Sequence, residues 1–473
     1  MRNWLVVGVL LLTQSQCARR DDAPIIILIT VDSLRWDVLG AYGSEHGLTP
    51  NLDKFARQAT RFDRAYATSS WTKPSIVSLM TGLLPSQHLV LMSGLKVHLN
   101  RAEQFADTDK KQELMQDVNQ RLGRLSVVPP HLPMFQEFLS GYARGAFVNN
   151  PHLHAQFGFD RGWDSFGFFP SKTFQTGTMY ANTPVMNGRI REFLANHKGP
   201  KFVWAHFNDV HYPYGPLETY LSRVRKTEVG FDLTRYDMGM HEQLATNADQ
   251  DTVSLLFDFY AAGLMQFDAN LGQLFQELRQ RREYDRALIL VVADHGEEFM
   301  EHGAMGHGNN LYETTFRVPL LVKLPHQNQP FVRGDVVSLI DVGPSILHYA
   351  NRLDLSPYSG RSAPLVTESR AGKGAVGALL SNDLRHLQTL VLGDEKIVVD
   401  VASGHIDLFQ IHGDHEVPLE NQQRAKALET KLLAVVGQYN FIGLVDQEPH
   451  QHSSDPLIDD HMMEQLRALG YVE

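Results

Sequence analysis

Two segments far apart in the chain share one pattern, and this pattern constrains the fold more than any other feature. Residues 25–37 read IIILITVDSLRWD and residues 288–298 read LILVVADHGEE, so each apolar run ends abruptly in acidic or imidazole side chains. Short aliphatic runs without polar alternation are typical of strands buried on both faces of a parallel sheet. Ligands gather at the carboxyl ends of such strands. We therefore expect Asp32, Asp294 and His295 to meet there, where their oxygen and imidazole groups favour a shared divalent metal ion.

Strands alternate with helices through the first 370 residues. Apolar residues recur at three- and four-residue spacing over 253–278, which predicts a long amphipathic helix. Thr49 and Pro50 predict a helix start with a hydroxyl cap followed by proline. The alternation predicts a doubly wound α/β catalytic domain over residues 24–370, with a mostly parallel central sheet flanked by helices. Its other elements are expected within 66–90 (a strand, then a helix), 131–150 (a helix, then a strand), 201–206, 318–324 and 335–350.

The pattern changes after about residue 370. Residues 387–411 contain short alternating strands separated by Gly-Asp and Ser-Gly turns, which predicts an antiparallel sheet. Helices are expected at 418–437 and 459–469. Residues 371–473 therefore form a smaller α+β subdomain.

Composition and charge indicate a globular protein that is not expected to bind nucleic acid. The chain has 473 residues, 43% of them hydrophobic, which is ample material for a large core. The net charge is −11, which disfavours a nucleic-acid partner. A polar, helix-prone stretch at 100–122 is expected to be a surface insertion that lines or shields a cleft.

The N-terminal segment, residues 1–17, predicts export. Arg2 precedes an apolar stretch that is too short to span a bilayer and that is typical of a secretory signal. The single cysteine, Cys17, follows this stretch, as in lipoproteins, although Gln14-Ser15-Gln16 is a poor match to such a signal. Two alternatives remain open, a lipid anchor at Cys17 and an ordinary cleaved signal. We expect a periplasmic or envelope location, with membrane contact through a lipid anchor alone.

Thr72 is the candidate nucleophile. It lies in SSWTKPS, followed by Lys73, at an expected helix N-terminus, where backbone N–H groups and the helix dipole favour bound anions. A free threonine hydroxyl is a weak nucleophile, and a nearby metal ion can activate it by lowering its pKa. Simple helix capping is the alternative for Thr72 and for Asp32. A satisfied hydrogen-bonded pair is the alternative for Asp294 and His295.

Four further histidines follow expected strands and can form a polar rim for a tetrahedral oxyanion. His211 lies in DVHYPY, and His307 is flanked by glycines that allow a close approach of backbone and ligand. The other two are His152 and His302. Taken singly, each is also consistent with a surface or hydrogen-bonded histidine.

Several blocks of the chain resemble the sulfatases of the alkaline phosphatase superfamily. They are VDSLRWDVLGAYG, TPNLDKFARQATRFDRAYA, SSWTKPSIVSLMTGLLPSQH, NNPHLHAQFGFDRGWDSF, DVHYPY, ADHGEEFMEHGAMGHGNNLYETTFRVPLLV and MMEQLRALGYV, in this order along nearly the whole chain. The resemblance implies an α/β core around a metal site and a C-terminal subdomain with a four-stranded antiparallel sheet. It also implies three sets of site residues. The metal ligands are Asp32, Thr72, Asp294 and His295; the catalytic residues are Thr72, His211 and His307; and the substrate contacts are Lys73, Asn150, His152 and His302.

The departures from this family concern the reacting group. Sulfatases place Cys or Ser at the nucleophile position, with an arginine after the proline, and oxidise it to formylglycine. Here Thr72 and Ile76 occupy these positions, Ser33 replaces a second acidic ligand, and Asn150 stands in place of a lysine. No formylglycine is therefore expected, and Thr72 itself becomes the attacking group. One divalent ion is implied, which can be Ca, Zn, Mn or Mg, and a second ion can bind near His211 and His307.

Three functions are consistent with these residues. The first is a metal-dependent hydrolase of sulfuric, phosphoric or phosphonic esters, acting on a small anionic ester of a glycan, lipid or small molecule. The second is an envelope transferase of phosphoethanolamine or glycerol-phosphate type that passes through a phospho-threonine. The third is an inactive relative that binds an anionic glycan or lipid. The metal constellation argues against the third. The transferases of this superfamily usually carry several membrane-spanning helices before the catalytic domain, and no such helices are expected here, which favours the hydrolase over the second.

Overall fold

The computed structural model describes residues 23–90, 127–170, 183–225, 238–246, 248–358, 365–367, 374–380, 385–401, 403–413 and 415–436. Several sequence predictions fall outside these ranges. They are the export segment with Cys17, the insertion at 100–122, the helix at 459–469 and the domain boundary near residue 370. Within the described ranges, no helix has the length and apolar character needed to cross a membrane.

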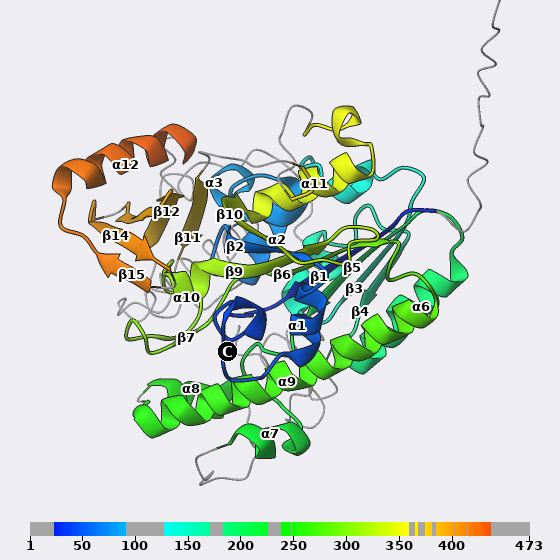
Figure 1. Cartoon of the computed structure of the whole chain (residues 1–473). Coiled ribbons are helices and arrows are strands. Elements are labelled where there is room, and N and C mark those ends of the chain that lie inside the picture. Colours follow the sequence, from blue (N-terminus) through cyan, green and yellow to red (C-terminus); the bar gives the residue numbers. More distant parts are fainter. Residues whose placement is uncertain are drawn as a thin grey trace, which may run out of the picture.

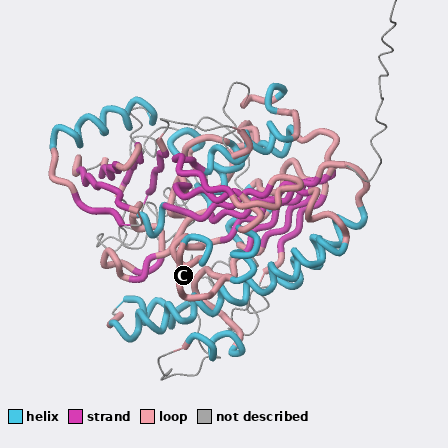
Figure 2. Tube along the Cα trace, in the orientation of Figure 1, coloured by secondary structure: helices cyan, strands magenta, loops and turns pink. Residues whose placement is uncertain are grey.

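A mixed eight-stranded sheet forms the centre of the molecule, in the order β10-β2-β9-β6-β1-β5-β3-β4 (Figures 1 and 2). Antiparallel pairing occurs where β9 meets β2 and β6, and the other neighbours are parallel. The prediction of a mostly parallel α/β sheet is therefore confirmed. The strands are β1 (Ile25–Val31), β2 (Thr60–Tyr66), β3 (Ala143–Val148), β4 (Ser165–Phe168), β5 (Lys201–Phe207), β6 (Ala287–Ala293), β9 (Arg317–Lys323) and β10 (Phe331–Ser338).

The two segments that open the sequence are neighbours in this sheet. β1 pairs in parallel with β6, with Ile25 opposite Ala287 and Val31 opposite Ala293. Every residue of both strands is buried, because helices cover both faces of the sheet. Burying a large aliphatic side chain contributes about 1.5–3 kcal/mol, so these runs supply much of the core. The common register also places the residues after both strands at the same edge.

Helices lie on both faces of the central sheet (Figure 1). The long helix α9 crosses one face together with α1 and α6, and α2 and α11 lie on the other. The predicted amphipathic helix is confirmed in α9, where Asp249 Oδ1 accepts a hydrogen bond from Thr252 N at 2.9 Å and caps its start. The helices are α1 (Pro50–Ala56), α2 (Thr72–Thr81), α3 (Pro85–His88), α6 (Thr183–Asn196), α7 (Glu218–Val224), α8 (Met238–Thr246), α9 (Gln250–Gln280), α10 (Glu313–Phe316), α11 (Val342–Tyr349) and α12 (Gln422–Val436).

Two local predictions were wrong in detail. α1 begins at Pro50 as expected, but the Thr49 hydroxyl does not cap it. That hydroxyl donates to Asp53 Oδ1 at 3.0 Å and accepts from Gly40 N at 3.1 Å, because a loop lies closer than the helix amides. The expected helix near 131–141 is a single 3₁₀ turn, Phe135–Phe138, enclosed between Pro133 and the left-handed Gly141.

A second sheet, beside the β10 end of the first, follows in the chain. It contains β11 (Ala375–Leu380), β12 (His386–Leu392), β13 (Glu395–Asp400), β14 (Ile406–His412) and β15 (His415–Pro418), paired antiparallel in this order. The antiparallel sheet is thus confirmed, with five strands rather than the four that the resemblance implies. α12 packs on it through Leu428 and Leu432, and confirms the helix expected at 418–437 (Figure 1). The remaining two-stranded sheet is β7 (Glu298–Phe299) with β8 (Met305–Gly306).

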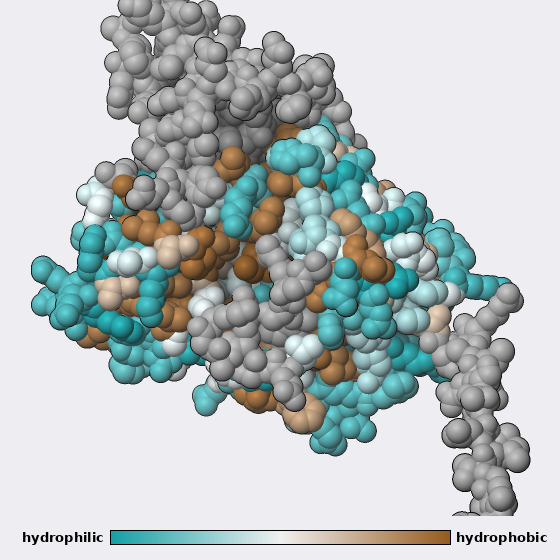
Figure 3. Space-filling model, turned by 90° about the horizontal axis from the view of Figure 1, so that it is seen from above, coloured by the Kyte–Doolittle hydropathy of each residue, from teal (hydrophilic) through white to brown (hydrophobic). Residues whose placement is uncertain are grey.

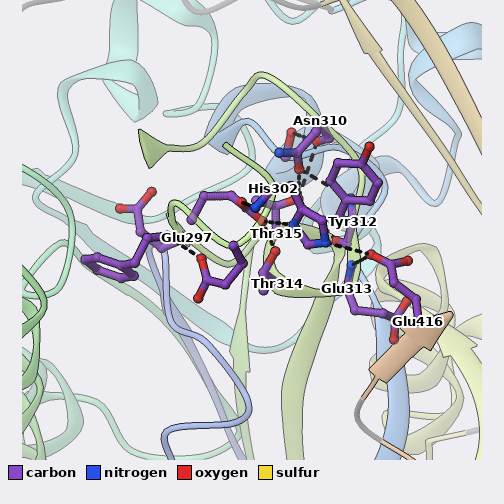
Figure 4. A network of polar contacts seen from close by, with 12 residues as sticks. Glu297, His302, Asn310, Tyr312, Glu313, Thr314, Thr315 and Glu416 are labelled. Carbon is purple, nitrogen blue, oxygen red and sulfur yellow. Dashed lines mark hydrogen bonds and ion pairs between the residues drawn. The ribbon is translucent and has the colours of Figure 1, made fainter. Parts of the chain in front are cut away.

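A buried ion-pair network joins the second sheet to the catalytic domain. Lys396 Nζ on β13 lies 3.2 Å from Glu313 Oε1 on α10 and 3.0 Å from Glu416 Oε2 on β15. Glu416 also accepts a hydrogen bond from the Glu313 amide at 3.0 Å (Figure 4). Because Lys396 is fully buried, its charge is compensated by these carboxylates rather than by water.

Viewed from above, the outer surface is largely hydrophilic, with apolar residues gathered toward the middle of that face (Figure 3).

Lys396→Met should destabilise the protein by about 3–5 kcal/mol, because it leaves two buried carboxylates side by side without a cation. The control is Lys426→Met on α12, where the pair with Glu429 is solvent-exposed on the lysine side. That change should cost less than about 1 kcal/mol. Urea unfolding of the three proteins measures the difference, and equal losses for both variants would contradict this account of the junction.

Candidate active site

The residues after β1 and β6 form a buried cluster. Asp32, Asp294 and His295 each offer a ligand atom, and these atoms all lie within 4.8 Å of one another. The backbone holds them there, since Asp32 N donates to Phe207 O at 2.8 Å and Asp294 N donates to Val31 O at 3.3 Å. The three side chains are completely buried. The structure therefore brings together three of the four residues that were predicted to be metal ligands.

The local backbone is shaped for this cluster. Ser33 has a left-handed φ of 55°, which is uncommon outside glycine and tends to occur at functional sites. This conformation aims its N–H at Asp294 Oδ1, 3.2 Å away. Gly296, the residue after His295, packs against the backbone of α10. A Cβ at this position would lie 1.9 Å from the Thr314 carbonyl oxygen. Any larger residue at Gly296 would displace the ligand pair.

The donor set fits a divalent cation. Asp294 Oδ1 accepts from Ser33 N and from His295 N, but Asp294 Oδ2 is buried without a hydrogen-bond partner among the described residues. His295 Nδ1 lies 2.9 Å from the Gly296 carbonyl oxygen, which can only accept, so Nδ1 carries the proton and Nε2 presents a lone pair to the cluster. A bare buried carboxylate oxygen is costly unless a cation or donor meets it.

The carboxyl groups of Asp32 and Asp294 have pKa values shifted in opposite directions. Burial opposes ionisation of Asp32, yet the neighbouring imidazoles of His211, His206 and His295 hold the pKa of this carboxyl well below its usual range. For Asp294, burial and the charge of Asp32 raise the pKa well above the usual range. Burial also lowers the pKa of His295, which keeps its imidazole neutral, as a metal ligand must be.

Thr72 opens α2 and faces this cluster. Its Oγ1 lies 3.4 Å from Asp32 Oδ2 and 3.4 Å from His295 Nε2. The helix is preceded by Trp71, which makes no side-chain cap, and the Thr72 hydroxyl is turned toward the ligands instead. The capping alternatives for Thr72 and Asp32 are therefore wrong. A hydroxyl at this spot can serve both as a ligand and as an attacking oxygen.

Lys73 is the residue beside Thr72 and carries an isolated charge. Its side chain is fully buried, and Nζ finds no hydrogen-bond partner among the described residues. The ammonium lies 3.5 Å from the centroid of the Phe157 ring, a cation–π contact. Burial lowers the pKa of Lys73 to about 7.

His307 and His211 lie next to the cluster. The His307 ring centroid is 4.3 Å from that of His295 and 4.9 Å from that of His211. His307 Nδ1 is 2.9 Å from Glu297 Oε1, so the carboxylate orients the ring, and its buried Nε2 has no partner among the described residues. His211 Nδ1 donates to the Tyr212 carbonyl. Both imidazoles thus lie beside the ligand cluster.

Two residues selected as substrate contacts have other partners in the structure. Asn150 Nδ2 donates to Asp32 Oδ2 at 2.6 Å, and Asn150 Oδ1 accepts from His152 N at 2.8 Å. Asn150 therefore holds a metal ligand, because a neutral amide can donate to the carboxylate that a lysine would contact by charge. His152 is buried beside it, and burial, with the charges of Lys73 and His211, lowers its pKa.

His302 lies at the junction with the second sheet, near Glu416 (Figure 4). Its Nδ1 is 2.9 Å from Glu298 Oε1, its Nε2 is 3.6 Å from Glu416 Oε1, and its ring stacks on Tyr312. With Arg385 it lines a cavity of about 180 Å³. His302 was predicted as one of the histidines that follow expected strands, but the turn between β7 and β8 places it against Glu298 and Glu416.

Sequence reasoning missed several residues that support the site. Glu297 orients His307, and Ser33 Oγ donates to Asp32 Oδ1 at 3.2 Å. His206 Nε2 lies 3.2 Å from Asp32 Oδ2. A sequence signal existed for His206, since it is a histidine inside the otherwise apolar strand FVWAHF, where a polar side chain needs a buried partner.

Comparisons with known proteins agree with this geometry. The chain matches the family model described as Sulfatase over residues 24–352. It is 23% identical over 407 residues to an endo-4-O-sulfatase of Bacteroides thetaiotaomicron, with 75% of each chain covered. It is also 23% identical over 406 residues to the multifunctional alkaline phosphatase superfamily protein PehA of Trinickia caryophylli, covering 73% of this chain and 77% of that one.

Two solved structures show the same fold. The phosphonate monoester hydrolase of Agrobacterium radiobacter aligns with a TM-score of 0.65 at 16% identity, covering 88% of this chain and 96% of that one. A protein solved with its substrate D-glucosamine-2-N,6-O-disulfate aligns with a TM-score of 0.66 at 15% identity, covering 91% and 100%. The chain therefore belongs to the sulfatase family, a family of ester hydrolases within the alkaline phosphatase superfamily.

Proposed function

We propose that this enzyme hydrolyses phosphoric or phosphonic esters, and sulfuric esters with them, using Thr72 as the nucleophile in a divalent-metal site made by Asp32, Asp294 and His295. One observation carries the proposal: Thr72 Oγ1 lies 3.4 Å from both Asp32 Oδ2 and His295 Nε2, at the N-terminus of α2. A divalent ion held by these residues would supply positive charge that lowers the pKa of the hydroxyl and offsets the charge of the ester.

The protein groups define the steps. The Thr72 hydroxyl donates a hydrogen bond to Asp32 Oδ2 at 3.4 Å, which orients Oγ1. Oγ1 attacks the phosphorus or sulfur, a new ester bond to threonine forms, and the bond to the leaving oxygen breaks, so that the alcohol departs with the proton that Thr72 loses. Water then cleaves the threonine ester and restores the hydroxyl. His211 and His307 contact the leaving or non-bridging oxygens, and Glu297 keeps the His307 ring in place.

The charge of the site favours esters with a single negative charge. Ile76 and Asn150 stand where an arginine and a lysine would supply cations, and Lys73 is the buried cation beside the nucleophile. A phosphodiester, a phosphonate monoester or a sulfate ester carries one charge, and a phosphate monoester carries nearly two at neutral pH. The solved neighbour named as a phosphonate monoester hydrolase supports this substrate class.

Thr72→Val should lower kcat by at least about a thousandfold, because it removes the attacking oxygen and keeps the side-chain shape. The matched control is Thr81→Val in the same helix, whose buried hydroxyl donates to Val77 O within the helix. That variant should keep its activity within about threefold. Turnover of p-nitrophenyl sulfate, phosphate, phosphonate and diester substrates gives the measurement, and activity that survives Thr72→Val would remove threonine from the mechanism. Tight binding of anionic glycans without turnover of any ester would favour a non-catalytic relative.

Chelation of divalent ions should abolish turnover and lower the melting temperature. A ligand that binds the folded chain at a hundred times its Kd adds about 2.7 kcal/mol to its stability. Asp294→Asn provides the comparison, because it weakens the ligand set and leaves the hydrogen bonds to Asp294 Oδ1 in place. The chelator should shift the melting temperature of this variant much less than that of the wild type. An equal shift in both proteins would place the bound ion elsewhere.

Lys73→Met should raise the free energy of unfolding by about 1–4 kcal/mol, because it removes a buried charge without a hydrogen-bond partner among the described residues. It should also lower kcat/KM, because the same ammonium is expected to bind the anionic ester. Lys201→Met is the opposite control. Lys201 is also buried, but its Nζ lies 3.2 Å from Glu283 Oε1 and 2.9 Å from Leu194 O, so its loss should destabilise. Denaturant unfolding and ester kinetics separate the two effects. Lost stability in Lys73→Met would show that the ammonium has a structural partner.

A further inference from the structure

We propose that His206 is a positioning residue that fixes the orientation of Asp32, and that Thr30 and Trp204 hold His206 in the required tautomer. The inference rests on the metal site of the proposed function and adds to it three residues outside the ligand set. All of these residues are completely buried, so His206 acts through Asp32 rather than by touching a substrate.

The strand register creates this arrangement. β1 and β5 pair in parallel with Thr30 directly opposite His206. Opposed residues point to the same face of a sheet, and Trp204, two residues before His206, points to that face as well. Asp32 follows Val31 at the end of β1 and continues the ladder by donating its N–H to Phe207 O at 2.8 Å. Three side chains from β5 and β1 therefore stand in line behind the carboxylate.

Three hydrogen bonds define the proton positions along this line. The Trp204 indole N–H can only donate, and it lies 3.0 Å from Thr30 Oγ1. Thr30 Oγ1 lies 2.8 Å from His206 Nδ1, closer than its 3.4 Å contact with Ala205 O. His206 Nε2 lies 3.2 Å from Asp32 Oδ2, and an ionised carboxylate can only accept.

The order of donors follows from these contacts. In the proposed tautomer, the proton on His206 Nε2 faces the Asp32 carboxylate, and Nδ1 faces the Thr30 hydroxyl as an acceptor. The Thr30 hydroxyl donates a hydrogen bond to Nδ1, and the Trp204 N–H donates a hydrogen bond to the oxygen of the same hydroxyl. The chain therefore runs in one direction, from Trp204 through Thr30 and His206 to Asp32. Carboxylate–imidazole contacts of this kind orient ligands and raise metal affinity.

Asp32 is held on this side by a second donor as well. Asn150 Nδ2 donates to the same Oδ2 at 2.6 Å, and Ser33 Oγ donates to Oδ1 at 3.2 Å. Donors at Oδ2 from two directions leave the carboxylate little freedom to rotate. Without His206, the Asp32 carboxylate would turn toward Asn150 and lose its alignment with Asp294 and His295.

The test compares metal affinity in four variants. Zn²⁺ affinity is measured by competition with a chromophoric chelator, so the readout does not depend on turnover. His206→Ala should weaken Zn²⁺ binding by about 10–100-fold. His206→Gln should recover most of this loss, because its amide can donate from the Nε2 position. Thr30→Val, which keeps the shape and removes the hydroxyl, should weaken binding by about tenfold.

Thr389→Val serves as the matched control. Thr389 is a fully buried strand threonine that donates to a strand carbonyl, Ile397 O at 2.7 Å, in the second sheet. This variant should bind Zn²⁺ within about twofold of the wild type. Melting temperatures in chelator verify that every variant folds. Thr30→Val should add little in the His206→Ala background, because both changes break the same chain.

The outcomes separate this inference from the proposed function. Wild-type affinity in both His206→Ala and Thr30→Val would overturn the positioning role and leave the ester hydrolase intact. Equal affinities of His206→Gln and His206→Ala would also overturn it, since shape rather than donation would then matter. Weakened Zn²⁺ binding in an enzyme that turns over no ester would support the inference and refute the function. A wild-type protein that binds no divalent ion would overturn both.

Discussion

The parallel pairing of β1 with β6 is the constraint on which the rest of the site depends. Because Val31 lies opposite Ala293, the next residues of both strands, Asp32 and the Asp294-His295 pair, emerge side by side. A shift of one residue in this register would turn the side chains to the opposite face. The apolar runs make such a shift unfavourable, since they are buried against helices on both faces. Core packing and metal geometry are thus set by the same strand pairing.

Buried charge is distributed in two ways in this molecule. Lys396 is matched by Glu313 and Glu416, and the network joins the second sheet to the catalytic domain. Lys73 and Asp294 Oδ2 have no such partner among the described residues. A buried charge without a partner destabilises the folded protein, so such a charge is retained where a bound ligand of opposite charge can pair with it. The contrast distinguishes the structural network from the reactive site, and both unmatched groups belong to the latter.

The orientation of the site depends on hydrogen bonds from side chains and backbone groups around it. Asn150 and His206 hold Asp32, Glu297 holds His307, and the Gly296 carbonyl holds His295. Such contacts fix tautomers and ring planes before a substrate arrives, which reduces the reorganisation needed in the transition state.

The sequence by itself determined the α/β architecture, the long helix α9, the antiparallel second sheet and the convergence of Asp32, Thr72, Asp294 and His295. These features follow from local patterns, because apolar strand segments, helix periodicity and polar residues at strand ends can all be recognised in short stretches of the sequence. The tertiary structure decided that Asn150 contacts Asp32, that His302 turns to Glu298 and Glu416, and that His206 and Glu297 support the ligands. These contacts join residues on separate strands and loops, and their partners depend on register and on side-chain direction. Neither quantity is encoded in the residues nearby in the chain.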